Sequence, residues 1–337
     1  MIPEREGLHL SMNKEAYLCL SAMLRARENR MLTADRAARM LEASGFEESV
    51  KLLGDCGYED LSGLSAAGVD AALSERRAAI LAELENLVPD KALVELFRLK
   101  YDYHNAKAVL KGEAMGVDPL RLMSVSGRVA PEKLKAAYDE ERLADLPPVL
   151  GAAMAEAGST LARTANPQLA DFELDQACFD EMKAIAAKLD NVFIKGYVKL
   201  LIDAANLKSA VRTARMRKSA DFLASVLIKG GADVDRIAAA DGDALAAIFA
   251  HTPLEKAASA GAEAIAGGSM TAFELLCDNA VNDYLRSAKL ISYGPEVVAA
   301  YIAAVENEIT AVRMILTGAL AGVDAETIRE RLRDLYA

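Results

Sequence analysis

Two helix-forming stretches of this sequence carry an acid, an amide and a base at the same spacing. They are "KYDYHNAKAVLKG", with Asp102, Asn105 and Lys107, and "IDAANLKSAVR", with Asp203, Asn206 and Lys208. These residue types could together form a catalytic site. On a helix, however, an acid and a base five residues apart are separated by about 140°, so they cannot both reach one substrate. The geometry and the repetition therefore favour a structural motif over a catalytic one.

A third, degenerate copy of the motif lies near the end of the chain. In "ENEITAVRMILTG" the acid and base places are taken by Glu308 and Arg313, and Ala311 stands where the asparagine is expected. The acids of successive copies are about 100 residues apart, and a second set of acids repeats upstream at a similar interval. This second set consists of Asp70, Asp175 and Asp278. The sequence therefore predicts three divergent repeats.

Each predicted motif helix has an apolar stripe one, four, seven and eight residues after its acid, which predicts a core-facing side. The stripe residues are Tyr103, Ala106, Val109 and Leu110; Ala204, Leu207, Ala210 and Val211; and Ile309, Val312, Ile315 and Leu316. Acid and amide lie about 60° apart at one edge of the stripe. We expect them to bond to a neighbouring helix end or to backbone.

Basic residues occupy the opposite edge of each stripe, one helical turn apart. They are Lys107 and Lys111, Lys208 and Arg212, and Arg313 alone in the third copy. Two interpretations stay open. This edge is a solvated face, which the spacing favours, or Lys107, Lys208, Arg212 and Arg313 face a partner.

The composition limits the class of protein. The 337 residues are 53% hydrophobic and carry a net charge of −11, which disfavours a nucleic-acid surface and binding to anionic lipid by charge alone. The four cysteines are far apart in sequence and are expected to be reduced, separately buried thiols. With neither a secretory signal nor a run of about 18 uncharged apolar residues, we expect an intracellular chain that does not cross a membrane.

The pattern along the chain predicts an all-α fold, with helix starts at Thr33 and at Gly294-Pro295. Residues 123–137 and 227–240, which follow the first two motifs, both resemble residues 30–43, so the N-terminus is expected to complete the third copy. We predict three helical units of about 100 residues in a closed, pseudo-threefold funnel. Their bounds are 10–121, 122–222 and 223–337, the last interlocked with the N-terminal helices.

No catalytic, cofactor or metal site is predicted. The sequence contains no G-x-x-x-x-G-K-[ST] loop and only three histidines, of which His104 is expected to pack between helices. A non-enzymatic assembly protein is therefore favoured over an enzyme.

Several segments together resemble the C-type subunits of the V-type/A-type ATP synthases, a family whose members in vacuolar ATPases are called d-type. They are Cys277-Asp278-Asn279, Gly294-Pro295-Glu296, the tyrosine-rich entry to Asn105 and the closing "IRERLRDLY". The resemblance runs from about Tyr17 to the last residue. Ala311 departs from the family pattern, and the opening "MIPEREGLHLSM", residues 1–12, matches nothing in it.

This resemblance implies a non-catalytic rotor subunit present in one copy per complex. It would be a socket that couples central-shaft subunits of the D and F type to the proteolipid ring, on the cytoplasmic side and without a lipid anchor of its own. Each motif helix would form one wall of the socket. A soluble helical scaffold outside any ATPase is the alternative.

Overall fold

The computed structural model describes residues 14–337, and within that range every regular element is a helix. The predicted all-α class is confirmed. Residues 1–12, which the resemblance left unplaced, lie outside the described residues. The α-helices are α1 Leu18–Glu28, α2 Ala34–Glu42, α3 Phe46–Lys51, α4 Ala66–Leu87, α5 Ala92–Met115, α6 Pro131–Asp139, α7 Pro148–Thr164, α8 Pro167–Leu189, α9 Val192–Arg215, α10 Ala220–Val226, α11 Val234–Ala239, α12 Gly242–Ile248, α13 Glu255–Ile265, α14 Met270–Arg286, α15 Pro295–Ala321 and α16 Ala325–Arg329. Short 3₁₀ turns include η1 Lys14–Tyr17, η3 Pro119–Leu122 and η5 Ser287–Leu290.

Local sequence signals account for the ends of these helices. Thr33 accepts a hydrogen bond from the Arg36 N–H at the start of α2, and Asn191 accepts one from the Ile194 N–H at the start of α9. Pro295 occupies the first turn of α15, where a missing N–H costs nothing. Gly322 ends that helix with φ +68°, a left-handed conformation that glycine adopts without strain.

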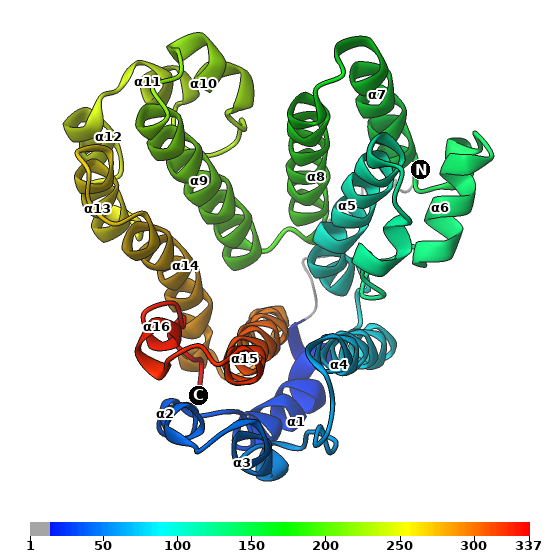
Figure 1. Cartoon of the computed structure of the whole chain (residues 1–337), viewed down its shortest axis with the longest axis vertical. Helices are drawn as coiled ribbons and strands as arrows, with labels where there is room; N and C mark the ends of the chain where they lie inside the picture. The colour runs from blue at the N-terminus through cyan, green and yellow to red at the C-terminus, as the bar shows by residue number, and fades with distance from the viewer. Residues whose placement is uncertain (1–13) are drawn as a thin grey trace, which may run out of the picture.

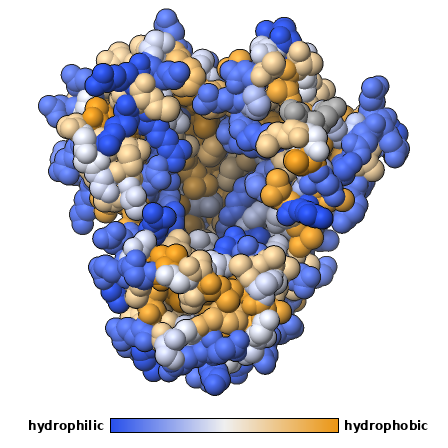
Figure 2. All heavy atoms as spheres, viewed as in Figure 1, coloured by the Kyte–Doolittle hydropathy of each residue, from blue (hydrophilic) through white to orange (hydrophobic). Residues whose placement is uncertain are grey.

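The three motifs lie on the long helices α5, α9 and α15, and each of these follows another long helix: α4, α8 and α14 (Figure 1). Each motif helix also packs against the first helix of another pair: α5 on α8, α9 on α14, and α15 on α4. The last of these contacts joins the third helix pair to the first. The six helices surround a central hollow, which Figure 2 shows with hydrophilic residues along its rim and more hydrophobic ones deeper inside.

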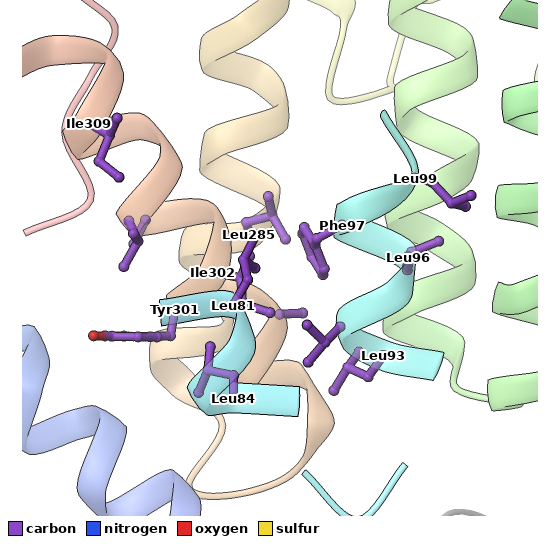
Figure 3. Close-up of a cluster of buried hydrophobic side chains, with 14 of the residues drawn as sticks. Leu81, Leu84, Leu93, Leu96, Phe97, Leu99, Leu285, Tyr301, Ile302 and Ile309 are labelled. Atoms are coloured by element: carbon purple, nitrogen blue, oxygen red, sulfur yellow. The ribbon is translucent and has the colours of Figure 1, made fainter. Parts of the chain in front are cut away.

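The predicted apolar stripes are confirmed as core faces, because all twelve of their residues are buried. One hydrophobic cluster draws buried residues from α1 to α9 and from α14 to α16, and a second lies between α9 and helices α10 to α14. Figure 3 shows Leu81 of α4 close to Leu285 of α14 and Ile302 of α15. Burial of these side chains therefore ties together helices that are distant in sequence.

The loop between α8 and α9 meets the start of α15 through a buried carboxylate. Asn191, between α8 and α9, donates from Nδ2 to Glu296 Oε1 at 2.9 Å, and the Lys14 ammonium lies 2.8 Å from the same oxygen. Burial works to raise the pKa of Glu296, but these two partners lower it overall. An ionised Glu296 therefore links the start of α15 to the α8–α9 loop and to the first described turn.

Candidate functional site

The two motif asparagines each hold a downstream segment by a pair of hydrogen bonds. Asn206 donates from Nδ2 to the Ile228 carbonyl at 2.8 Å and accepts from the Ile228 N–H at 2.8 Å. Asn105 pairs in the same way with Ser124, at 2.8 and 2.7 Å. One buried amide thus satisfies both backbone groups of a residue outside any helix.

The two motif aspartates bind the same segments a few residues further on. Asp203 Oδ1 accepts from the Ala232 N–H at 2.6 Å, and Asp102 Oδ1 accepts from the Val129 N–H at 3.1 Å. The Arg128 guanidinium also donates to Asp102, at 2.6 Å. Acid and amide therefore bond to backbone, as their place at the edge of the stripe predicts.

Glycines allow the backbone to come this close to the carboxylates. A Cβ at Gly231 would lie 2.0 Å from Asp203 Oδ1, and one at Gly127 would lie 2.4 Å from Asp102 Oδ1. Neither distance is compatible with a side chain.

The third copy uses the N-terminal part of the chain. Glu308 Oε2 accepts from the Leu32 N–H at 2.6 Å, and Glu308 Oε1 accepts from the Tyr58 hydroxyl at 2.8 Å. Leu32 lies in the 30–43 segment, so the N-terminal part of the chain supplies the backbone group that Glu308 binds.

All three motif acids are buried, and burial raises the pKa of each. Hydrogen bonds and the Arg128 guanidinium oppose this shift at Asp102, and the bonds from Ala232 and from Leu32 oppose it at Asp203 and Glu308. The balance still leaves each pKa above its ordinary value. Such shifts occur at catalytic sites, but here they follow from packing.

The basic residues of the motifs pair with the upstream acids of the neighbouring helix pair. Lys107 lies 2.5 Å from Asp175, Lys208 pairs with Asp278, and the Arg313 Nε lies 2.7 Å from Asp70 Oδ1, without hydrogen-bond alignment. Two of these contacts have a companion one turn further along, Lys111 with Asp171 and Arg212 with Glu274. From the sequence, these basic residues are expected to face either water or a partner. In the structure they pair with carboxylates of the same chain.

The hollow contains two adjoining pockets of about 450 and 690 Å³. Lys208 lines the smaller pocket and Arg313 the larger, whereas Lys107 and Arg212 line neither. The acids and asparagines of the motifs line neither pocket. Acid and base of one motif therefore do not meet at a common site.

The hollow has wall residues that the motif alone does not reveal. Arg77, Lys100 and Tyr101 line both pockets, and Glu306 and Arg333 line the smaller one. Lys100 and Glu306 stand two residues before the acids of their motifs, so extending the repeat comparison upstream by two residues would have marked them. Arg77 and Arg333 carry no such signal.

Two further sequence expectations concern a histidine and the cysteines. His104 is exposed, with Nε2 2.9 Å from the Leu122 carbonyl, so the expectation that it packs between helices is wrong. Its side chain leaves α5 on the side of the larger pocket. Cys56, Cys178 and Cys277 are buried as expected, but Cys19 is exposed because it lies on the outer side of α1.

Two absences within residues 14–337 bear on the kind of site. These residues contain no group of three His, Cys, Asp or Glu side chains arranged to hold a metal ion. None of the helices in that range combines the length and the apolar character that crossing a bilayer requires.

Comparison with known proteins identifies the class. The model of the ATP synthase (C/AC39) subunit family matches residues 20–331, nearly the whole chain. The chain belongs to this family.

Named relatives include the C-type subunit of the V-type ATP synthase of Thermus thermophilus, which is 28% identical over 229 residues, covering 65% of this chain and 68% of that protein. The C-type subunit of the V-type sodium ATPase of Enterococcus hirae is 21% identical over 322 residues, covering 94% of this chain and 98% of that protein. The resemblance to the C-type subunits is thus confirmed.

Proposed function

We propose that this chain is a non-catalytic coupling subunit of a V/A-type rotary ATPase. It acts as a socket that receives the central shaft, made of D- and F-type subunits, and passes torque between the shaft and the proteolipid ring. It works on the cytoplasmic face, in one copy per complex. In this proposal the three helix pairs are related by rotations near 120° and form the funnel expected from the repeats.

The observation that carries this proposal is the closed series of contacts around the hollow. Each motif helix packs against the first helix of another pair, and an ion pair accompanies each contact. A closed wall resists twisting better than an open stack, because no end is free to splay. Membership of the C/AC39 family supplies the rotary complex in which such a wall has a use.

The charge of the cavity supports a shaft with an acidic surface. The chain has a net charge of −11, yet its two pockets are lined by more cations than carboxylates. The cations are Arg77, Lys100, Arg121, Lys208, Arg313 and Arg333, and the carboxylates are Asp70, Glu75, Asp278 and Glu306. Complementary charge mainly raises the rate of association.

Charge reversal tests the socket. Lys208→Glu combined with Arg212→Glu should slow association with the isolated shaft subunits and weaken its dependence on salt, in stopped-flow or surface-binding measurements. Lys133→Glu, exposed on α6, is the matched control. Unchanged rate and salt dependence in the double variant would exclude these residues from shaft binding.

Attachment to the membrane is proposed to be through protein. The net negative charge disfavours an anionic leaflet, and linked contacts to shaft and ring would raise avidity without new contacts. Flotation with anionic liposomes should therefore recover the chain only when the ring is reconstituted in them. Equal recovery on bare liposomes would mean that the chain anchors on lipid. Failure to co-purify with any ATPase subunit would favour the helical scaffold instead.

A further inference from the structure

The smaller pocket of the hollow is lined by the same motif position from all three motif helices. This position, two residues before the acid, is Lys100 on α5, Leu201 on α9 and Glu306 on α15. Three similar walls therefore present a cation, an aliphatic side chain and a carboxylate to one space. We call the part of the pocket lining around these three residues the floor; because their side chains differ, its two sides differ in chemistry.

One side of the floor is polar. Lys100 pairs with Glu306, and the Tyr101 hydroxyl donates to Glu306 Oε1 at 2.9 Å. The side chain of Lys100 is 47% exposed, whereas that of Glu306 is 15% exposed. The cation, more than the carboxylate, is thus available to an incoming group.

Arg77 adds positive charge to this polar side. Its Nε donates to the Ser126 hydroxyl at 3.0 Å, and its guanidinium lies 4.6 Å from the centre of the Tyr101 ring. Within residues 14–337 no carboxylate forms an ion pair with it. A buried guanidinium held by hydroxyls and an aromatic ring retains a strong preference for a negative partner.

The other side of the floor is apolar. It includes the partly buried Leu201, Ala205 and Val281, backed by the buried Ala204 and Leu285, and Asn282 of α14 is its polar member. Asp278, at the edge of this side, already binds both Lys208 and Arg333. This side therefore has no unpaired carboxylate for a cationic occupant and favours hydrophobic contact.

We infer that the floor of the hollow admits the end of an amphipathic helical shaft in one angular orientation. The apolar side of the shaft packs against α9 and α14, and its acidic side faces Arg77 and Lys100. Rotating the shaft from one motif helix to the next would place its carboxylates against Leu201 and its apolar groups against Lys100 and Glu306. Charged groups would then be buried without partners, which disfavours the other two orientations. This inference rests on the proposed socket function and adds a fixed alignment between shaft and socket.

Cross-linking from equivalent positions tests the orientation. Ala205 on α9 and Thr310 on α15 both line the pocket two residues after their motif acids. In a Cys19→Ser background, Ala205→Cys and Thr310→Cys are each combined with single cysteines placed around the tip of the isolated shaft subunits. We expect Ala205→Cys to link to apolar positions of the shaft and Thr310→Cys to acidic positions on another side. Linking of both to the same side, or to all sides equally, would overturn the fixed orientation.

An affinity measurement gives an independent readout. Leu201→Lys should weaken binding of the shaft subunits at least tenfold, whereas Leu320→Lys, a change at an exposed leucine outside both pockets, should change it less than twofold. Leu201→Gln serves if the lysine variant does not fold, with the same direction expected. Wild-type affinity in a folded Leu201 variant would overturn the inference while leaving the socket intact. If the wild-type chain does not bind the shaft at all, the socket proposal itself fails.

Discussion

The first two motif helices and the third each hold a backbone segment through a carboxylate, but they use different side chains to do so. In α5 and α9 an aspartate and an asparagine hold a segment that follows in the chain, and a glycine lets that segment approach. In α15 the acid is Glu308, the asparagine is Ala311, and the segment held comes from the N-terminus and has no glycine near Leu32.

The extra methylene of glutamate explains the third arrangement. A longer side chain reaches the Leu32 N–H from further away, so the backbone of residues 30–32 does not need to come as close as Gly127 and Gly231 do. Side-chain length and glycine are therefore alternative ways to set the same distance. All three copies therefore keep the helix pair, whereas the side chains that bind the held segment differ with that segment.

Adding a methyl group where the backbone approaches the acid should have the largest effect. Gly231→Ala would place Cβ 2.0 Å from Asp203 Oδ1, so either the carboxylate or the segment must move, and we expect a loss of about 2–4 kcal/mol in the free energy of unfolding. Urea denaturation measures it. Gly54→Ala, with no atom within 4 Å of the new Cβ, is the matched control. Equal stability of the two variants would show that the close approach is not needed.

Substitutions at the amide position, which is Asn206 in the second copy and Ala311 in the third, should lower the free energy of unfolding in both copies. Asn206→Ala leaves both backbone groups of Ile228 buried without a partner and should cost about 2–3 kcal/mol by the same measurement. Ala311→Asn should also destabilise, by about 1–3 kcal/mol, because it introduces a buried amide in a copy whose held segment is bound by Glu308 and not by an amide. Stabilisation by Ala311→Asn would mean that the third copy retains a hidden partner for the amide.

The pH dependence of Glu308 gives a smaller, signed effect. Burial raises its pKa, so the folded chain binds the proton more readily than the unfolded chain does. The cost of burying the charge is therefore full above the raised pKa and disappears as the pH falls below the ordinary glutamate value. Glu308→Gln should be most stable relative to wild type near pH 8 and should lose that advantage toward pH 4, as urea midpoints at several pH values can measure. An advantage that instead grows toward acid would contradict the assignment.

The ion pairs between helix pairs should contribute least. Arg313 and Asp70 are 39% and 53% exposed, so a double-mutant cycle with Arg313→Ala and Asp70→Ala should give a coupling of about 0–1 kcal/mol that declines in salt. The Lys208–Asp278 pair, with exposures of 23% and 28%, serves as the comparison and should couple more strongly. A coupling of several kcal/mol at Arg313 would make this contact a principal support of the closed wall.

The sequence by itself determined the helices, their buried faces and the residues that clamp. The apolar stripes of Tyr103, Leu207 and Ile315 follow from the 3.6-residue period, and the role of Asn206 follows from its place at the edge of a stripe, because both depend on geometry within one helix. Only the tertiary structure decided which carboxylate Lys107 and Arg313 meet, and that Lys100, Leu201 and Glu306 line one pocket. These contacts join segments from different helix pairs, and the local period that predicts a buried face says nothing about which distant helix will cover it.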